Sequence, residues 1–195
     1  MELLLAVGVG VGLASVAGVR AFLPLALAAL FTVLGLFANF EFVSTYLGVG
    51  EWTMTAVLGA LALVEIVLDK IRALERGFNY IMIPTRTVSG ALLFLAALGP
   101  LVETGPVPWL VAGALIAGII AFLKVFLRPP AKVEASGVSA RFLSGAEDVM
   151  ALAGGAVGVL IPFVPPLLVG FLLFFYFRVR KRRGRKYGGL RILGD

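Results

Sequence analysis

The chain has 195 residues, of which 61% are apolar and only 14% are charged. An average soluble domain has about 25% charged residues, so this composition excludes an ordinary soluble protein and indicates a membrane protein. The chain has no cysteine and no histidine, which excludes disulfides, thiolate chemistry, and imidazole bases or metal ligands. Proton or metal chemistry would therefore fall to carboxylates, and we expect no bound cofactor.

Long uncharged runs separate the charged residues. They cover Leu3 to Val19 (17 residues), Ala21 to Phe40 (20), Thr104 to Leu123 (20) and Val149 to Phe177 (29). A helix that crosses a hydrocarbon layer about 30 Å thick needs roughly 20 apolar residues. The sequence therefore predicts an all-α, polytopic transmembrane bundle of about seven helices. We expect a single membrane domain over residues 1–180 and a basic C-terminal tail over residues 181–195.

The expected helices follow from the apolar runs and from the prolines near their ends. In chain order they cover about residues 3–17, 24–38, 52–74, 84–102, 108–127, 143–161 and 167–180. Pro24 and Pro84 are expected to open the second and fourth helices, since proline fits the first helical turn. Pro129 should end the fifth, because proline disfavours helix in the residue before it. The first two helices are short, so they form either two spans or a broken or re-entrant hairpin that turns near Arg20.

A weak internal repeat relates the third and fourth expected helices to the fifth and sixth. Each pair begins with a tryptophan, Trp52 or Trp109, and contains a Ser-Gly-Ala segment that starts at Ser89 or Ser144. These two segments agree at five of eleven positions, although Ala and Gly are abundant throughout the chain. Repeats are common in membrane transporters, where the substrate site lies between them. A duplicated helix hairpin remains open at this stage.

The positions of Lys and Arg give the chain a direction in the membrane. If the C-terminus is cytoplasmic, alternating helices place all 17 basic residues on the cytoplasmic side, including the dense segment Arg178-Val-Arg-Lys-Arg-Arg-Gly-Arg-Lys186. Glu2, Glu41, Glu51 and Glu103 then fall outside. Because positive charge is retained in the cytoplasm, we predict a multi-pass membrane protein with its N-terminus outside and its C-terminus in the cytoplasm. The tail should meet anionic lipid headgroups rather than nucleic acid, and self-association is left open.

The most informative residues are charges at positions where a membrane helix should be apolar. Glu65 and Asp69 lie four residues apart and so share one helix face, and Lys124 and Arg128 have the same spacing. An ionised side chain at the bilayer centre costs about 3 kcal/mol on insertion scales, so such residues should face one another or water. The candidate site comprises Arg20, Glu65, Asp69, Arg86, Lys124, Arg128, Glu147 and Asp148.

Two hypotheses follow from these charges. In the first, they line a polar cavity open to the cytoplasm, with Arg20 and Arg86 near its mouth, and form the pathway of a transporter or channel for a small ion or polar solute. The carboxylates would carry a cation or proton, and a metal, if one binds, would use Glu65, Asp69, Glu147 and Asp148. In the second, the ion pairs only fix helix packing in a structural or scaffold membrane protein.

Three segments carry a resemblance to a known family. They are Ala17-Gly-Val-Arg-Ala-Phe-Leu-Pro-Leu25, Leu63-Val-Glu-Ile-Val-Leu-Asp-Lys70 and Ser144-Gly-Ala-Glu-Asp-Val149. In this order they resemble elements of a bacterial inner-membrane family known only as a domain of unknown function, DUF4126. The similarity covers about residues 10–175, and the link Arg128-Pro-Pro-Ala-Lys132 departs from it. The resemblance implies a polytopic membrane fold and brings no assigned activity.

An enzymatic alternative comes from a second, more distant resemblance. Glu65-x-x-x-Asp69 followed by Pro84-Thr-Arg-Thr-Val-Ser-Gly90 is similar to the Glu-x-x-x-Glu and Pro-Gly-x-Ser-Arg-Ser elements of undecaprenyl-pyrophosphate phosphatases. In such a site the carboxylates would hold a divalent cation while the arginine binds a phosphoryl oxygen. The motif glycine and first serine are missing here, and Asp69 replaces a glutamate. A polyprenyl-phosphate phosphatase is therefore the less favoured hypothesis.

Overall fold

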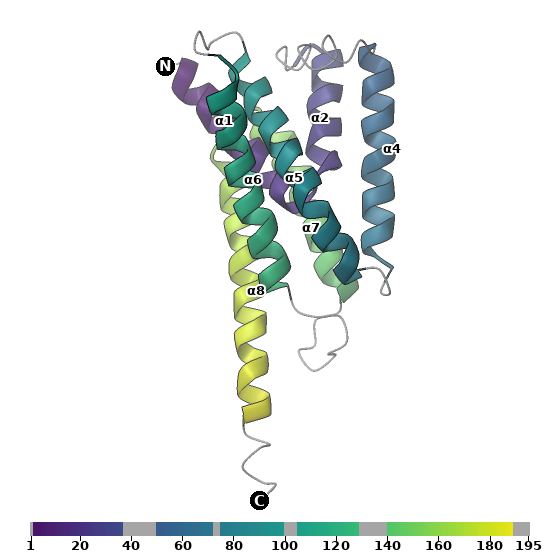
Figure 1. Ribbon diagram of the computed structural model, residues 1–195, viewed down its shortest axis with the longest axis vertical. Coiled ribbons are helices and arrows are strands. Elements are labelled where there is room, and N and C mark those ends of the chain that lie inside the picture. Colours follow the sequence, from purple (N-terminus) through teal and green to yellow (C-terminus); the bar gives the residue numbers. More distant parts are fainter. Residues whose placement is uncertain (1, 37–49, 72–74, 100–104, 129–139, 189–195) are drawn as a thin grey trace, which may run out of the picture.

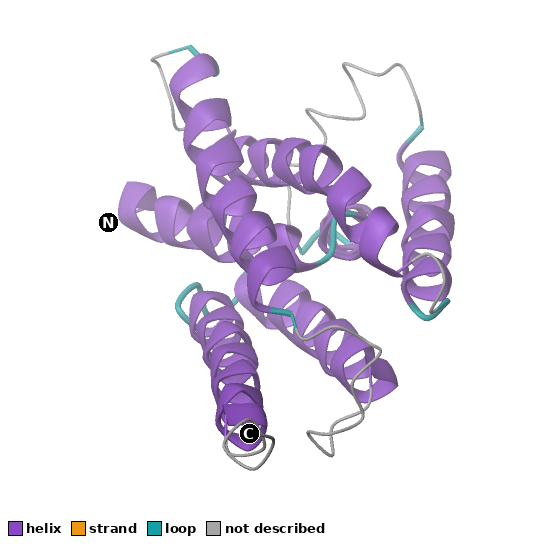
Figure 2. Cartoon of the chain, turned by 60° about the horizontal axis from the view of Figure 1, so that its bottom comes forward, coloured by secondary structure: helices purple, strands orange, loops and turns teal. Residues whose placement is uncertain are grey.

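The computed structural model of the chain describes residues 2–36, 50–71, 75–99, 105–128 and 140–188. These residues form seven helices and no strand, which confirms the predicted all-α class. The helices are α1 (Glu2–Val19), α2 (Phe22–Val33), α4 (Glu51–Asp69), α5 (Glu75–Leu98), α6 (Val107–Leu127), α7 (Ala140–Gly158) and α8 (Val164–Gly188). They gather in one bundle (Figure 1), and in the tilted view they cross one another at wide angles (Figure 2).

The lengths and surfaces of the helices fit a lipid environment. Four segments are long and apolar enough to cross a membrane: α1, α4, Gly77–Leu98 of α5, and α6. Large apolar side chains are exposed along α4, α6 and α8, among them Val64, Val67, Leu115, Phe122 and Phe171. Water disfavours an apolar surface of this extent, whereas lipid accommodates it. The chain is therefore a multi-pass membrane protein.

The first two helices form a hairpin that is broken at Arg20. α1 ends at Val19 and α2 begins at Phe22, so Arg20 lies at the break. α2 has 12 residues and is about 18 Å long, which is shorter than a hydrocarbon layer of about 30 Å. The N-terminus and the far end of α2 lie at the same end of the bundle in Figure 1. The structure therefore has a broken hairpin, and its re-entrant path through the membrane stays a prediction.

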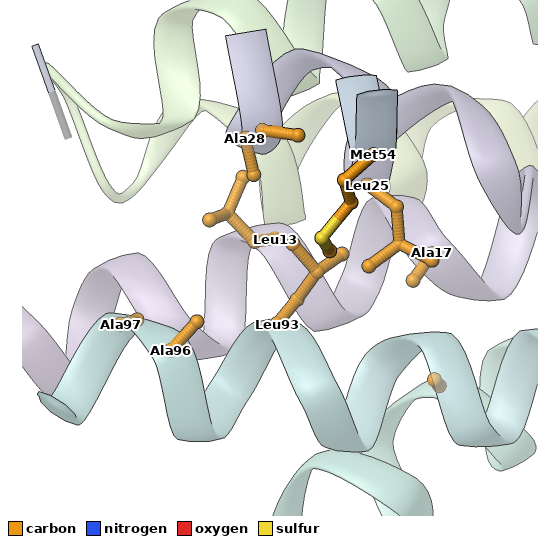
Figure 3. Packing of buried hydrophobic residues seen from close by; sticks show 10 residues of the cluster. Leu13, Ala17, Leu25, Ala28, Met54, Leu93, Ala96 and Ala97 are labelled. Carbon is orange, nitrogen blue, oxygen red and sulfur yellow. The ribbon is translucent and has the colours of Figure 1, made fainter. Parts of the chain in front are cut away.

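Helix α1 is the centre of the bundle and packs against α2, α5, α6, α7 and α8. Its buried residues are mostly glycine, alanine and valine, and small residues allow neighbouring helices to approach closely in a membrane. Leu13 of α1 lies in a core cluster with Leu93 of α5 and Ala28 of α2, and Met54 of α4 reaches the same cluster (Figure 3). This packing fixes the broken hairpin among four other helices.

The contact between α5 and α6 depends on two glycines. A Cβ atom added at Gly90 would lie 2.2 Å from the Cβ atom of Ala117. A Cβ atom added at Gly113 would lie 2.5 Å from the carbonyl oxygen of Gly90. Both distances are far below van der Waals contact, so the two backbones cross at a separation that only glycine permits.

The prediction that Pro84 opens the fourth helix was wrong. α5 begins at Glu75 and carries Pro84 in its interior. An internal proline removes one helical hydrogen bond, but surrounding helices make this tolerable in a membrane protein. α8 also begins earlier than expected, at Val164, and it places Pro165 and Pro166 in the first turn, where proline fits.

Other predicted boundaries shift or cannot be compared. α4 ends at Asp69 instead of residue 74, and α8 continues to Gly188, past the predicted domain boundary at residue 180. The expected ends at residues 38, 74 and 102, the link at 129–139 and the tail residues 189–195 lie outside the described residues. In the suspected repeat, α4 packs mainly on α2 while α5 packs mainly on α6 and α1. The duplicated hairpin stays a prediction.

We predict that Gly90→Ala lowers the free energy of unfolding by about 1–3 kcal/mol, because the added methyl group forces α5 and α6 apart. Gly59→Ala is the matched control, since nothing lies within 4 Å of a Cβ atom at Gly59 of α4. It should leave stability unchanged or raise it by up to about 1 kcal/mol. Thermal unfolding in detergent measures both. Equal stability of the two variants would contradict the close crossing.

Candidate functional site

The break between α1 and α2 leaves helix-end amides and carbonyls inside the bundle, and Glu65 of α4 binds the amides. Its carboxylate accepts hydrogen bonds from the backbone N–H groups of Ala21 (3.2 Å) and Phe22 (3.1 Å). These groups form the N-terminal end of α2, where the helix dipole is positive, so a carboxylate is the favoured partner. The Glu65 side chain is buried.

Lys124 of α6 binds the carbonyl end of α1, whereas Glu65 binds the amide end of α2. Its Nζ atom donates a hydrogen bond to the carbonyl oxygen of Val19, the last residue of α1, at 2.8 Å. A cation at this end of a helix is stabilised by the negative pole of the dipole. The hydroxyl of Ser89 on α5 donates to the carbonyl oxygen of Ala21 at 2.6 Å. Side chains from α4, α5 and α6 thus satisfy the broken backbone.

Asp69, one turn after Glu65, accepts hydrogen bonds from four side chains. Its Oδ2 atom lies 2.8 Å from Nη2 of Arg20 and 2.7 Å from the hydroxyl of Ser144. Arg128 donates to both carboxylate oxygens, at 3.0 and 3.3 Å, in the bidentate geometry that makes such pairs strong. The side-chain amide of Asn79 donates to Oδ1 at 2.9 Å. This carboxylate therefore joins four helices and the break.

Glu147 of α7 is the second anionic centre and is fully buried. Its Oε2 atom lies 2.8 Å from Nζ of Lys124 and 3.5 Å from Nη2 of Arg20. Arg128 lies within 3.3 Å of both of its oxygens, and the hydroxyl of Tyr176 on α8 donates to Oε1. Lys124 and Arg128 each contact a second partner as well, so the anions are linked through shared cations.

The cluster reaches the protein surface beside Asp148. Its carboxylate lies 2.7 Å from Nη2 of Arg20 and 3.5 Å from Nζ of Lys70, whose side chain is 49% exposed. At the opposite side, Nη2 of Arg86 donates to Asn79 at 3.0 Å and lies 3.6 Å from Oε1 of Glu65. The network therefore runs from a half-exposed lysine to a fully buried arginine.

The structure brings all eight predicted site residues into one cluster. The acidic and basic pairs do not simply face each other, because Arg128 binds Asp69 while Lys124 binds Glu147. The expected position of Arg20 and Arg86 near a cavity mouth is wrong, since both side chains are fully buried. The broken hairpin carries Arg20 into the bundle, and α5 holds Arg86 against Asn79 and Glu65.

Sequence reasoning missed several uncharged members of the cluster. They are Asn79, Ser89, Ser144 and Tyr176, all buried and hydrogen-bonded within the network. Asn79 was assigned to a link because the helix was expected to start at Pro84. Tyr176 lies in a run of phenylalanines, and its hydroxyl was the available signal. The two serines begin the Ser-Gly-Ala segments of the suspected repeat.

The four candidate metal ligands face basic side chains in this structure. Asp69, Glu147 and Asp148 contact Arg20, and Glu65 contacts Arg86. Within the ranges that the structure describes, no group of three or more acidic residues could hold a metal ion. What the geometry offers instead is a set of cations and anions that can exchange partners over short distances.

The fold and this cluster define a multi-pass membrane protein with a broken helix hairpin and a buried charge network at its turn. The family model described as domain of unknown function (DUF4126) matches residues 7–182. The chain belongs to this family, as the three sequence segments predicted. No match was found among curated proteins or solved structures. The family description assigns no activity, so function has to be argued from the geometry.

We predict that Lys124→Met lowers the free energy of unfolding by about 3–5 kcal/mol, because it removes one partner of a buried ion pair and uncaps Val19. Lys70→Met is the matched control, since its ion pair is half-exposed and should contribute at most about 1 kcal/mol. Both are measured by thermal unfolding in detergent. A similar small loss in both variants would show that the Lys124 contacts do not hold the break.

Proposed function

We propose that the protein is a transporter or channel for a small ion or polar solute, with the charge cluster at the α1–α2 break as part of its path. The observation that carries this proposal is a helix broken inside the bundle, with its two ends bound by Glu65 and Lys124. Broken helices at membrane depth occur where the backbone lines protein or water, and transporters use such helix ends to bind their substrates.

The energetic cost of the cluster supports a functional role. Ionisable residues within membrane segments are expensive and more often mark pathways than simple packing. Apolar residues of similar volume frequently stabilise a fold as well as a buried ion pair does. A chain that buries Arg20, Arg86, Lys124 and Glu147 completely therefore maintains an arrangement that packing alone does not require.

The contacts also suggest how the path opens. Arg128 lies 3.0 Å from Asp69 and 3.3 Å from Glu147, so small movements shift it from one carboxylate to the other. Arg20 likewise lies between Asp69 and Asp148. An entering ion would take the place of one of these partners, and the half-exposed pair of Lys70 and Asp148 offers the shortest route to the surface.

The same proposal includes a bacterial inner-membrane location with the C-terminus in the cytoplasm. Arg178, Arg180 and Lys181 lie near the far end of α8, whereas Glu2 and Glu51 begin α1 and α4 at the other end of the bundle (Figure 1). Basic residues on one side and acidic residues on the other agree with retention of positive charge in the cytoplasm. The basic end of the chain would then lie against anionic lipid headgroups.

A structural role is the second candidate, and one observation favours it. The buried part of the network pairs four basic side chains with four acidic ones, so it can close on itself. In that case the charges would fix helix packing and would transport no ion or solute. The phosphatase hypothesis stays a prediction. Release of phosphate from a polyprenyl diphosphate would support it if the release depends on Mg²⁺ and is lost in Asp69→Asn.

We predict that purified protein in liposomes conducts at least one member of a panel of small ions and organic solutes, and that Glu65→Gln reduces the flux about tenfold or more. This magnitude corresponds to the loss of one charge-assisted hydrogen bond at the helix break. Glu51→Gln, at the exposed start of α4, is the matched control and should conduct as the native protein does.

Stability measurements on the same samples separate the two candidates. If no solute moves through the native protein and Glu65→Gln only lowers the unfolding temperature, the structural role is correct. If Glu65→Gln stays folded and loses flux while Glu51→Gln retains it, the transport role is supported.

We predict that a cysteine introduced by Glu51→Cys reacts with an impermeant maleimide on intact cells, whereas one introduced by Lys181→Cys reacts only after permeabilisation. Both positions are exposed at helix ends, and the native chain has no cysteine to interfere. Labelling is read on a gel by mass shift. The reverse pattern would place the C-terminus outside the cytoplasm.

A further inference from the structure

Two buried arginines keep hydrogen-bond donors that no described residue uses. The side chains of Arg20 and Arg86 are fully buried, yet Nε and Nη1 of both have no partner in the part of the chain that the structure describes. Nε carries one N–H group and Nη1 carries two, so each guanidinium retains three donors. Buried polar groups in native proteins are nearly always paired. Six unused donors on two buried cations therefore call for an acceptor.

The carboxylate nearest to Arg86 does not meet this need. Glu65 lies 3.6 Å from Nη2 of Arg86, and its two oxygens already accept the backbone N–H groups of Ala21 and Phe22. Arg20 lies in the break itself, and Lys124 of α6 binds the carbonyl oxygen of Val19 at the same turn. Positive charge is therefore concentrated where α5 and α6 meet the hairpin break.

Among the described contacts, the buried part of the network is balanced. Its basic members are Arg20, Arg86, Lys124 and Arg128, and its acidic members are Glu65, Asp69, Glu147 and Asp148, while Lys70 adds a half-exposed basic side chain. Asp69 and Glu147 each contact several cations, whereas Arg86 contacts one carboxylate at the edge of ion-pair distance. An anion beside Arg86 would accept the donors that these acidic residues leave unused.

We infer that a small, singly charged inorganic anion, such as a halide or nitrate, binds beside Arg20 and Arg86 at the helix break. The inference rests on the proposed function and names the substrate class of that site. Complete burial of Arg20, Arg86 and Lys124 favours an ion of a few atoms over an organic anion. Nε and Nη1 of the two guanidinium groups supply the donors, and the positive N-terminal end of α2 lies beside them.

Anion binding to the purified protein tests this inference without any flux measurement. The protein is kept in detergent with gluconate at constant ionic strength, and chloride, nitrate or sulfate replaces part of the gluconate. We expect a saturable rise of the unfolding temperature with chloride or nitrate and a weaker effect of sulfate. Equilibrium dialysis with radiolabelled chloride should give about one bound ion per chain, because the unused donors of Arg20 and Arg86 form a single site.

Substitutions of a buried and of an exposed arginine provide the comparison. Arg86→Gln should weaken binding about tenfold or more, the loss expected for one charge-assisted hydrogen bond. Arg86→Lys keeps the charge and should bind more tightly than Arg86→Gln. Arg178→Gln, which removes an exposed arginine of α8, should bind as the native protein does. If Arg86→Gln does not fold, the native protein and Arg86→Lys still give the comparison of anions.

Each outcome bears on one proposal or the other. Absence of saturable chloride and nitrate binding to native protein, equal affinity in Arg86→Gln, or a preference for sulfate would overturn the anion site. Saturable binding without flux of any anion would retain the site and contradict transport. Cation flux without anion binding would retain transport and remove the anion as its substrate.

Discussion

The structure depends on how the backbone N–H and C=O groups at the break between α1 and α2 are hydrogen-bonded inside an apolar bundle. Where α1 stops and α2 starts, backbone amides and carbonyls lose their helical partners in a region where water is scarce, and each unpaired group is costly. Glu65 binds the amides of Ala21 and Phe22, and Lys124 binds the carbonyl of Val19. Each charge also has the sign that the adjacent helix dipole favours. These contacts attach α4 and α6 to the hairpin and fix where both helices lie.

The rest of the charge network grows from these two residues by helical periodicity. One turn after Glu65, α4 presents Asp69 to the same interior, and one turn after Lys124, α6 presents Arg128. Asp69 and Arg128 then bind each other in a bidentate pair. Helix α7 adds Glu147, which closes the network by binding Lys124 and Arg128. A helix break that needed a cation and an anion is thus the centre of a network that joins side chains of five helices, α4 to α8, to the turn between the first two.

Hydrogen-bond donors and acceptors are unevenly distributed in the network, and this distribution distinguishes it from simple packing. Around Asp69 and Glu147 every carboxylate oxygen has basic or hydroxyl partners. Around Arg86, donors exceed acceptors, because the oxygens of Glu65 are taken by backbone amides. Gly90 and Gly113 bring α5 close to α6, and the Arg86 side chain of α5 is fully buried. A region that is closed, positively charged and short of acceptors suits a small anion better than it suits a metal ion.

The sequence by itself determined the membrane class, the helical fold and the eight charged residues of the cluster. This succeeded because a charge in a lipid-spanning segment is so unfavourable that it stands out without any structure. Tertiary structure alone decided that the first two helices fold back on each other at Arg20, that Lys124 pairs with Glu147, and that Pro84 lies within a helix. It also added Asn79 and Tyr176. Uncharged polar residues are tolerable at many positions, so only the neighbours that the fold brings to them give them a role.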